Sequence, residues 1–212
     1  MTLEAIRRGP APGAAEQLVV LLHGVGANGQ DLIDLAPSWA PALPHAAFVA
    51  FDAPEPYDGA PFGRQWFSLA DRMPATILAG ARRARPVLLE AIGAELARLG
   101  LPAERVAVMG FSQGAMMALF AGLQRDPAPA CVLAYSGALL PVESANGAPV
   151  LLVHGEADEV VPWQLGRDAE RGLRALGVPV ESLWCPGLGH GIDAAGLSAG
   201  GLFLQRSFAR VE

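Results

Sequence analysis

The sequence predicts an α/β protein with a mostly parallel central sheet that carries helices on both faces. Short apolar runs alternate along the chain with longer segments of helical spacing, which is the pattern of such sheets. The run at 106–109 contains only apolar residues, as a strand buried on both faces requires. It leads directly into Gly110-x-Ser112-x-Gly114, a turn typical of a strand that passes into a helix.

The first half of the chain is expected to hold strands at 17–23 and 46–52, with a helix at 31–40 between them. A loop rich in proline and aromatic residues is expected at 53–69, followed by helical spacing at 74–99. Pro86 lies inside this last segment and cannot donate a helical hydrogen bond, so we expect it to break the helix or to begin a second one.

The second half repeats the alternation. Further strands are expected at 106–109, 130–136, 150–154 and 180–185, and helices at 113–124, 163–176 and 194–209. No repeat or long linker interrupts the pattern, so residues 1–212 are expected to form one domain. Ligands of parallel sheets bind at the carboxyl ends of the strands, which is where we look for a site.

Composition excludes several classes of function. The 212 residues are 52% hydrophobic, which excludes disorder, yet the apolar runs are too short for a membrane span. The net charge is −6 and all fifteen cations are arginine, clustered only at 82–85, so nucleic-acid binding is not expected. The first residues lack the long apolar stretch of a signal peptide, which favours a cytoplasmic location.

Neither the cysteines nor the histidines indicate a metal site. Cys131 and Cys185 lie in apolar, strand-like runs and are expected to be buried free thiols. The four histidines have no paired spacing, and no Cys-x-x-Cys occurs. We therefore expect no metal site.

Ser112 is the candidate nucleophile. A tight strand-to-helix turn holds such a serine exposed at the carboxyl end of the sheet, and the glycines two residues away avoid collisions with the packed strand and helix. The chain has a second G-x-S-x-G match at Ser198. That match follows no apolar strand and has no histidine downstream, so we interpret it as a loop or helix start.

A serine hydroxyl needs a base to take its proton, and the base needs a carboxylate to orient it. Two histidines follow Ser112. His154 ends an apolar strand and is expected to bond to the backbone, whereas His190 lies in a glycine-rich loop after the last strand and is the candidate base. Asp158, between the two, directly follows a strand and is the candidate orienting acid.

The other carboxylates near these positions are expected to be solvated. They are Glu156 and Glu159 in the same loop as the candidate acid, Asp168 within a predicted helix, and Asp126 at the end of another. Glu156 and Glu159 remain less favoured rivals for the acid, whereas Asp168 and Asp126 are expected to be surface residues of helices.

Two backbone N–H groups are needed to hold the oxyanion of an acyl-transfer intermediate. We assign them to Gln113, directly after the nucleophile, and to Val25, in the glycine-rich loop after the first predicted strand. His23, which begins that loop, is interpreted as structural. The glycines of this loop also resemble a nucleotide-binding pattern, with Asp52 about 23 residues further on, but we assign no acidic ribose partner at the expected strand end and do not favour this alternative.

Four motifs together resemble the phospholipase/carboxylesterase family of α/β hydrolases, which includes the acyl-protein thioesterases. They are LLHGVGANGQDL at 21–32, GFSQG at 110–114, DEVVP at 158–162 and Gly189-His190, and the likeness spans about residues 17–205. The resemblance implies an α/β-hydrolase fold, esterase activity without a cofactor, and Ser112, Asp158 and His190 as the triad. It also implies a homodimer.

No long insertion resembles a lid, so we expect an open site for small or accessible acyl groups. Phe62, Trp66 and Phe67 are candidates to line the acyl pocket, because similar proteins place this loop beside the serine. The leading hypothesis is a serine carboxylesterase acting on esters of short to medium acyl chains. The alternatives are an acyl-protein thioesterase or lysophospholipase with the same triad, and a non-catalytic binding protein of the hydrolase fold.

Overall fold

The computed structural model describes residues 3–210, and a seven-stranded sheet runs through them with the order β1-β3-β2-β6-β7-β8-β9. Every neighbouring pair is parallel except β1 with β3, so the mostly parallel sheet is confirmed. Its strands are β1 (Ala5–Arg8), β2 (Gln17–Leu22), β3 (Ala46–Phe51), β6 (Val106–Phe111), β7 (Cys131–Tyr135), β8 (Val150–Gly155) and β9 (Val180–Cys185).

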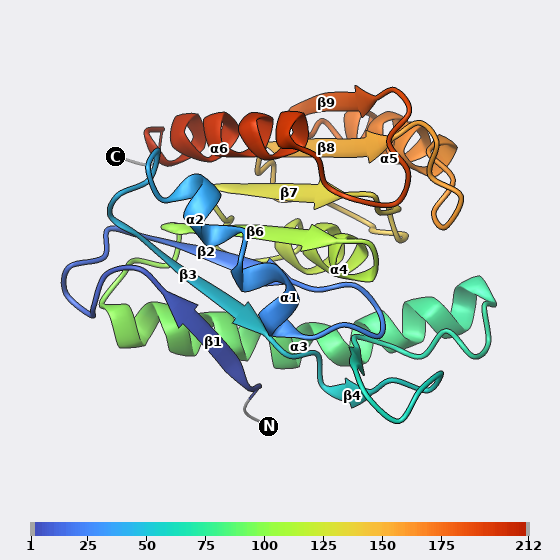
Figure 1. Cartoon of the computed structure of the whole chain (residues 1–212), viewed down its shortest axis with the longest axis horizontal. Coiled ribbons are helices and arrows are strands. Elements are labelled where there is room, and N and C mark those ends of the chain that lie inside the picture. The colour runs from blue at the N-terminus through green and yellow to red at the C-terminus, as the bar shows by residue number, and fades with distance from the viewer. Residues whose placement is uncertain (1–2, 211–212) are drawn as a thin grey trace.

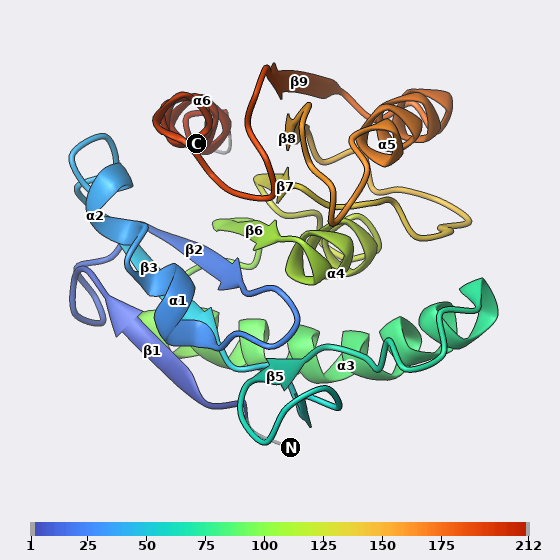
Figure 2. The same cartoon turned by 45° about the vertical axis from the view of Figure 1, so that its right-hand side comes forward.

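Helices cover both faces of this sheet, as the alternating pattern predicts (Figures 1 and 2). On one face lie α1 (Gly29–Ile33), α2 (Ala36–Trp39) and α6 (Ala194–Phe208); on the other lie α3 (Pro74–Leu99), α4 (Gln113–Gly122) and α5 (Gln164–Ala175). The sheet therefore lies between two helical layers. Its inner strands are buried, whereas the edge strands β1 and β9 are partly exposed.

The hydrophobic core is divided by the sheet into two clusters because successive side chains of a strand point to opposite faces. In β6, Val106 and Val108 join the cluster that contains residues of α3 and α4, whereas Ala107 and Met109 join the cluster of α1, α2 and α6. This two-sided burial explains why the central strands are apolar without alternation.

The segment at 31–40 differs from the expected helix, because it forms two short ones. Helix α1 ends with Asp34 as its C-cap, and α2 restarts with Pro37 in its first turn. Proline lacks the N–H that a continuous helix needs at that position, but it is tolerated in the first turn of a helix. A new helix therefore begins there.

Pro86 does not break α3, contrary to our expectation. The helix is continuous over Pro74–Leu99 with Pro86 inside it. The missing hydrogen bond is tolerated because Ala84, Leu88 and Ile92, on both sides of the proline, are buried in the core. Tertiary packing therefore outweighs a local preference.

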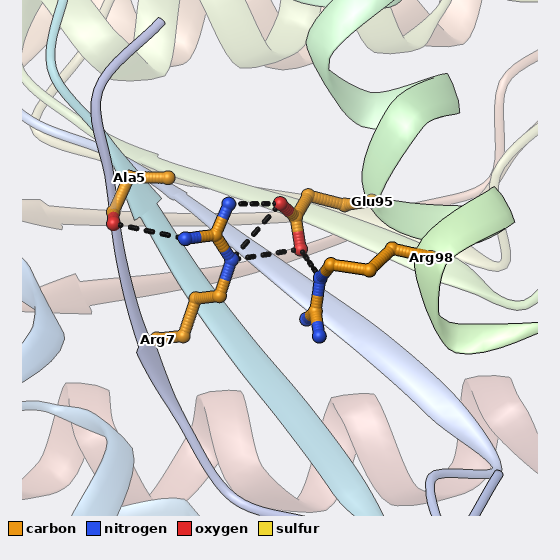
Figure 3. A network of polar contacts seen from close by, with 4 residues as sticks. All are labelled: Ala5, Arg7, Glu95 and Arg98. Atoms are coloured by element: carbon orange, nitrogen blue, oxygen red, sulfur yellow. Dashed lines mark hydrogen bonds and ion pairs between the residues drawn. The ribbon is translucent and has the colours of Figure 1, made fainter. Parts of the chain in front are cut away.

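Strand β1 has no counterpart in the sequence prediction; it pairs with β3, and Figure 3 shows a further polar contact that holds it. The guanidinium of Arg7 binds the carboxylate of Glu95 in α3, with Nε 3.0 Å from Oε1. Arg98 Nε donates to the other oxygen of Glu95 at 2.8 Å, and Arg7 also reaches the carbonyl of Ala5. This ionic contact attaches the antiparallel edge strand to the longest helix.

Three further features of the described residues concern function classes. Cys131 and Cys185 are buried free thiols, as predicted. Within residues 3–210 there is no helix with the length and apolar character needed to cross a bilayer. Nor does any cluster of three or more histidine, cysteine or acidic side chains suited to a metal ion occur in this range.

Candidate active site

Ser112 sits in a strained turn between β6 and α4. Its backbone angles are φ 56° and ψ −118°, a conformation that few residues other than glycine adopt. A Cβ added to Gly110 would lie 2.1 Å from the carbonyl oxygen of Gly114, and one added to Gly114 would lie 1.9 Å from that of Leu22. Both glycines are therefore required for the reason that the sequence predicts.

The turn places the serine at the amino end of a ten-residue helix. The Ser112 N–H donates to the carbonyl oxygen of Tyr135 in β7 at 2.9 Å, which anchors the strained residue to the neighbouring strand. The unpaired N–H groups of the first helical turn carry partial positive charge, so this position favours a developing anion.

Asp158 and His190 meet beyond the carboxyl end of β8. Oδ2 of Asp158 accepts a hydrogen bond from Nδ1 of His190 at 2.7 Å, although 32 residues separate them. Oδ1 accepts the N–H groups of Val160 and Val161, both at 2.9 Å. The carboxylate is thus fixed by its own loop while one oxygen remains for the histidine.

His154 is a further partner of this carboxylate. Its ring is 2% exposed, and Nε2 donates to the carbonyl oxygen of Val161 at 2.8 Å, which agrees with the expected backbone bond. The same nitrogen lies 3.3 Å from Oδ2 of Asp158. Sequence reasoning missed this contact, although the spacing of four residues between His154 and Asp158 was available.

The environment of Asp158 favours its charged form. Burial raises the pKa of the carboxyl, but the hydrogen bonds from His190, Val161 and Val160 outweigh burial and hold the pKa below its ordinary value of 3.8. An ionised Asp158 requires that Nδ1 of His190 carry its proton, which leaves Nε2 as an acceptor.

His23 adopts one defined tautomer at the start of the glycine-rich loop. Nδ1 donates to the carbonyl oxygen of Gly24 at 2.7 Å, and Nε2 accepts the N–H of Ala53 at 3.0 Å. Burial lowers the pKa of this imidazole, which is consistent with a neutral ring. Asp52 accepts the N–H of Gly29 at 2.7 Å, so it supports the start of α1.

A cavity of about 520 Å³ opens beside these residues. Ser112, His190 and Val25 all line it, so the structure brings the candidate nucleophile and base to one space with one of the two candidate oxyanion donors. Its apolar walls come from residues that sequence reasoning did not select, namely Leu32, Leu35, Phe111, Val160 and Ile192.

The sequence contained a signal for several of these wall residues. Phe111, Val160 and Ile192 each lie one or two positions from a triad candidate, and the Phe111 ring packs against that of His190 at a centroid distance of 4.8 Å. Residues this close to a triad candidate lie near the same cavity, although only some of them line it. The side that each one faces depends on loop geometry that the sequence does not display.

The predicted acyl-pocket residues require a correction, because none of them lines this cavity. Phe62 is 74% exposed at the surface, whereas Trp66 and Phe67 are 0% exposed inside the core. Aromatic side chains in a loop next to the serine can either line a binding pocket or pack in the core, and Trp66 and Phe67 pack in the core. Gln113, the other candidate oxyanion donor, has its side chain bonded to this buried loop.

The rejected candidates lie elsewhere. Ser198 is exposed in the first part of α6 and borders a separate groove beside α2. The four alternative carboxylates, Glu156, Glu159, Asp126 and Asp168, are all exposed, and Asp168 forms an ion pair with Arg171. None of these residues lines the cavity of Ser112.

Comparison with known proteins places the chain in a family. Residues 8–207 match the family described as phospholipase/carboxylesterase. The chain belongs to the phospholipase/carboxylesterase family. Its fold is accordingly that of the α/β hydrolases, and it is a hydrolase of the esterase and thioesterase type.

Several members of this family are similar over most of the chain. Esterase YpfH of Escherichia coli K12 is 33% identical over 182 residues, which are 84% of this chain and 78% of the relative. Acyl-protein thioesterase 1 of Schizosaccharomyces pombe is 33% identical over 176 residues, 73% of this chain and 74% of the relative. The crystal structure of esterase PE8 superposes with a TM-score of 0.91 at 38% identity, covering 97% of this chain and 99% of that one.

Proposed function

We propose that the chain is a serine carboxylesterase that hydrolyses esters of short to medium acyl chains through an acyl-enzyme on Ser112. The observation that carries the proposal is the 2.7 Å contact between Nδ1 of His190 and Asp158, made at the wall of the cavity that Ser112 also lines. That contact directs the unprotonated Nε2 of the histidine away from Asp158, as a general base for the serine requires.

In the first half of the proposed reaction, Ser112 Oγ bonds to the ester carbonyl carbon while its proton passes to Nε2 of His190. The carbonyl oxygen becomes an oxyanion that the N–H groups of Val25 and Gln113 hold. When the oxyanion collapses, the bond to the alcohol breaks and His190 gives its proton to the departing oxygen.

In the second half, a water molecule attacks the acyl carbon and His190 takes its proton. The resulting oxyanion collapses, the bond to Ser112 breaks, and the serine recovers its proton from the histidine. Asp158 stays ionised throughout and stabilises the imidazolium that forms in each half.

The walls of the cavity support a neutral, apolar acyl group as substrate. Leu32, Leu35 and Ile192 offer apolar contact. Apart from the histidines, Asp31 is the one lining residue with an ionisable side chain. Val160 at the cavity is 68% exposed, so the site is open to solvent and to acyl groups of accessible substrates. A cavity of about 520 Å³ is within the usual range for small ligands.

Hydrolysis of thioesters is the second candidate, favoured by the similarity to acyl-protein thioesterase 1 of Schizosaccharomyces pombe. The same triad and oxyanion donors serve both bond types. A comparison of oxygen esters and thioesters that share one acyl chain separates the two functions. The cytoplasmic location, the absence of a cofactor and the homodimer remain predictions from the sequence.

The test is hydrolysis of p-nitrophenyl esters across acyl lengths by the wild-type protein and by Ser112→Ala. We expect turnover of the shorter esters and a fall in kcat of about 10⁴-fold or more in the variant. Equal activity of Ser112→Ala and wild type would contradict the proposed nucleophile. Activity that is confined to thioesters would favour the thioesterase function over the carboxylesterase function.

A further inference from the structure

One short segment contacts both backbone regions that carry the proposed oxyanion donors. We call residues 64–67 the brace; it begins with the strand β5 (Arg64–Gln65), which pairs with β4 (Glu55–Pro56). The backbone of Arg64 is paired with the glycine-rich loop, since its carbonyl oxygen accepts the N–H of Gly26 at 2.8 Å and its N–H donates to Ala27 at 2.9 Å. These bonds hold the loop just after Val25.

The brace also holds the loop just before Val25. The indole Nε1 of Trp66 donates to the carbonyl oxygen of His23 at 2.9 Å. Val25 is therefore flanked on both sides by residues that are bonded to the same four-residue segment. The approach is close, because a Cβ on Gly63, directly before the brace, would lie 2.1 Å from the carbonyl oxygen of Gly26.

The same segment is bonded to the other donor residue. The side-chain amide of Gln113 accepts the N–H of Trp66 at 2.8 Å through Oε1 and donates to the carbonyl oxygen of Phe67 at 2.7 Å through Nε2. This paired contact fixes the first residue of α4, whose backbone N–H is the second proposed donor. Trp66 thus bonds to both donor-bearing regions, once through its indole and once through its backbone.

The contacts among Trp66, Phe67, Gln113 and His23 are shielded from water. Trp66 and Phe67 are 0% exposed and Gln113 is 1% exposed, so solvent does not compete for the bonds. Hydrogen bonds in such surroundings restrict position strongly, and an unpaired partner is costly. The separation of the two donor regions therefore depends on the brace as well as on the sheet.

We propose that Trp66 is a positioning residue that sets the relative placement of the Val25 and Gln113 N–H groups. The inference rests on the proposed function, because it presupposes that these two groups hold the oxyanion of a Ser112 adduct. Displacement of a donor by a fraction of an ångström weakens transition-state stabilisation far more than substrate binding. Trp66 acts in this way without touching the substrate.

The variant Trp66→Phe tests the proposal, with Trp39→Phe as its matched control. Trp39 is also buried, and its indole Nε1 donates to the carbonyl oxygen of Leu197 at 2.8 Å, in the contact between α2 and α6. Both variants remove one indole-to-carbonyl hydrogen bond of a buried tryptophan and leave a ring in place. Thermal unfolding then reports whether their structural costs are similar.

The decisive probe is an alkyl trifluoromethyl ketone, compared with its carbinol. Ser112 Oγ adds to the ketone carbon, the serine proton passes to His190, and the carbonyl oxygen becomes an oxyanion. The carbinol occupies the same cavity but has no carbonyl to attack. The ratio of the two inhibition constants therefore measures oxyanion stabilisation separately from binding.

We expect Trp66→Phe to lower kcat about tenfold, with KM nearly unchanged, and to weaken the ketone by the same factor while sparing the carbinol. Trp39→Phe should leave kcat and both inhibition constants within about twofold of wild type. A Trp66→Phe enzyme whose ketone-to-carbinol ratio equals that of wild type would overturn the proposal.

Gln113→Met provides an independent variant if Trp66→Phe does not fold. It removes both side-chain bonds to the brace and keeps the backbone N–H, so the same selective loss of ketone affinity is expected. A wild-type protein that binds the ketone no better than the carbinol would overturn the proposed function together with the brace. If the wild type binds the ketone better than the carbinol and both variants keep the same ratio of inhibition constants, the positioning role of the brace is overturned and the proposed function is not.

Discussion

Nε2 of His154 lies 3.3 Å from Oδ2 of Asp158, the oxygen that also accepts the 2.7 Å hydrogen bond from His190. His154 belongs to β8, and the same nitrogen donates to the carbonyl oxygen of Val161 in the loop that carries Asp158. The sheet therefore supports the loop through His154, and the loop supports the carboxylate. Contacts other than the one with His190 therefore help to orient Asp158.

Replacing His154 should affect activity through position and not through proton transfer. We expect His154→Leu to lower kcat about tenfold and to destabilise the protein by about 1–3 kcal/mol, because a buried acceptor loses its donor. His154→Gln, which retains an N–H, should recover part of both losses. Measured kcat values and unfolding free energies check this, and a loss in His154→Leu as deep as that of His190→Ala would contradict it.

Asp158→Asn should leave the fold intact and nearly abolish activity. The amide oxygen still accepts the N–H groups of Val160 and Val161, but the amide nitrogen forces His190 into the wrong tautomer, at a cost of about 10⁴ in kcat. The matched control is Asp168→Asn on the exposed side of α5, for which we expect wild-type kcat. Ester hydrolysis and circular dichroism of both variants decide the outcome.

Two glycine-to-alanine substitutions should have opposite effects on stability. Gly114→Ala places a Cβ 1.9 Å from the carbonyl oxygen of Leu22, so we expect a loss of about 3 kcal/mol or more and no detectable activity. Gly93 is solvent-exposed and lies in the middle of α3, with nothing within 4 Å of an added Cβ. Gly93→Ala should therefore raise the free energy of unfolding by about 0.5–1 kcal/mol. Denaturant unfolding of the two variants measures both changes.

The ionic contact of β1 with α3 predicts a dependence of stability on pH. Burial raises the pKa of Glu95, but the hydrogen bonds from Arg7 and Arg98 outweigh it and hold the pKa below its ordinary value of 4.5. A carboxyl whose pKa is lower in the folded protein than in the unfolded chain stabilises the fold at pH values above its unfolded-state pKa. This stabilisation is lost as the pH falls through its folded-state pKa.

Glu95→Gln should therefore be less stable than wild type at pH 7 by about 1–3 kcal/mol, and the difference should shrink below about pH 4. The control is Glu143→Gln, at an exposed loop position, which should follow the wild-type curve. Unfolding free energies measured from pH 7 to pH 3 test the prediction. A constant difference across this range would contradict the assigned charge pairing.

The sequence predicts the central part of this fold because the residues there satisfy several requirements at once. The strand at β6, the glycines around Ser112 and the helix that follows are all fixed by close backbone packing, which tolerates few residue types. Long apolar strands with buried faces leave equally clear patterns. The same reasoning fails for β1, a four-residue edge strand with two exposed arginines, which pairs with β3 and is tied to α3 through Arg7 and Glu95.

The walls of the site are harder to predict than its polar groups. Asp158 and His190 follow strands, so their meeting at one edge of the sheet is a consequence of topology. Whether Trp66 faces the cavity or the core depends on how its loop folds back. The sequence around Trp66 contains no pattern that predicts this orientation. The hydrogen bonds of Trp66 to His23 and Gln113 join residues more than forty positions apart.

The most direct test of the central claim is to label the nucleophile with a fluorophosphonate probe and to identify the modified peptide by mass spectrometry. In the labelling step, a serine Oγ–P bond forms, fluoride leaves and the proton passes to His190. We predict a single adduct on the peptide that contains Ser112, absent from Ser112→Ala and retained in Ser198→Ala. An adduct on Ser198, or labelling that persists in Ser112→Ala, would contradict the account.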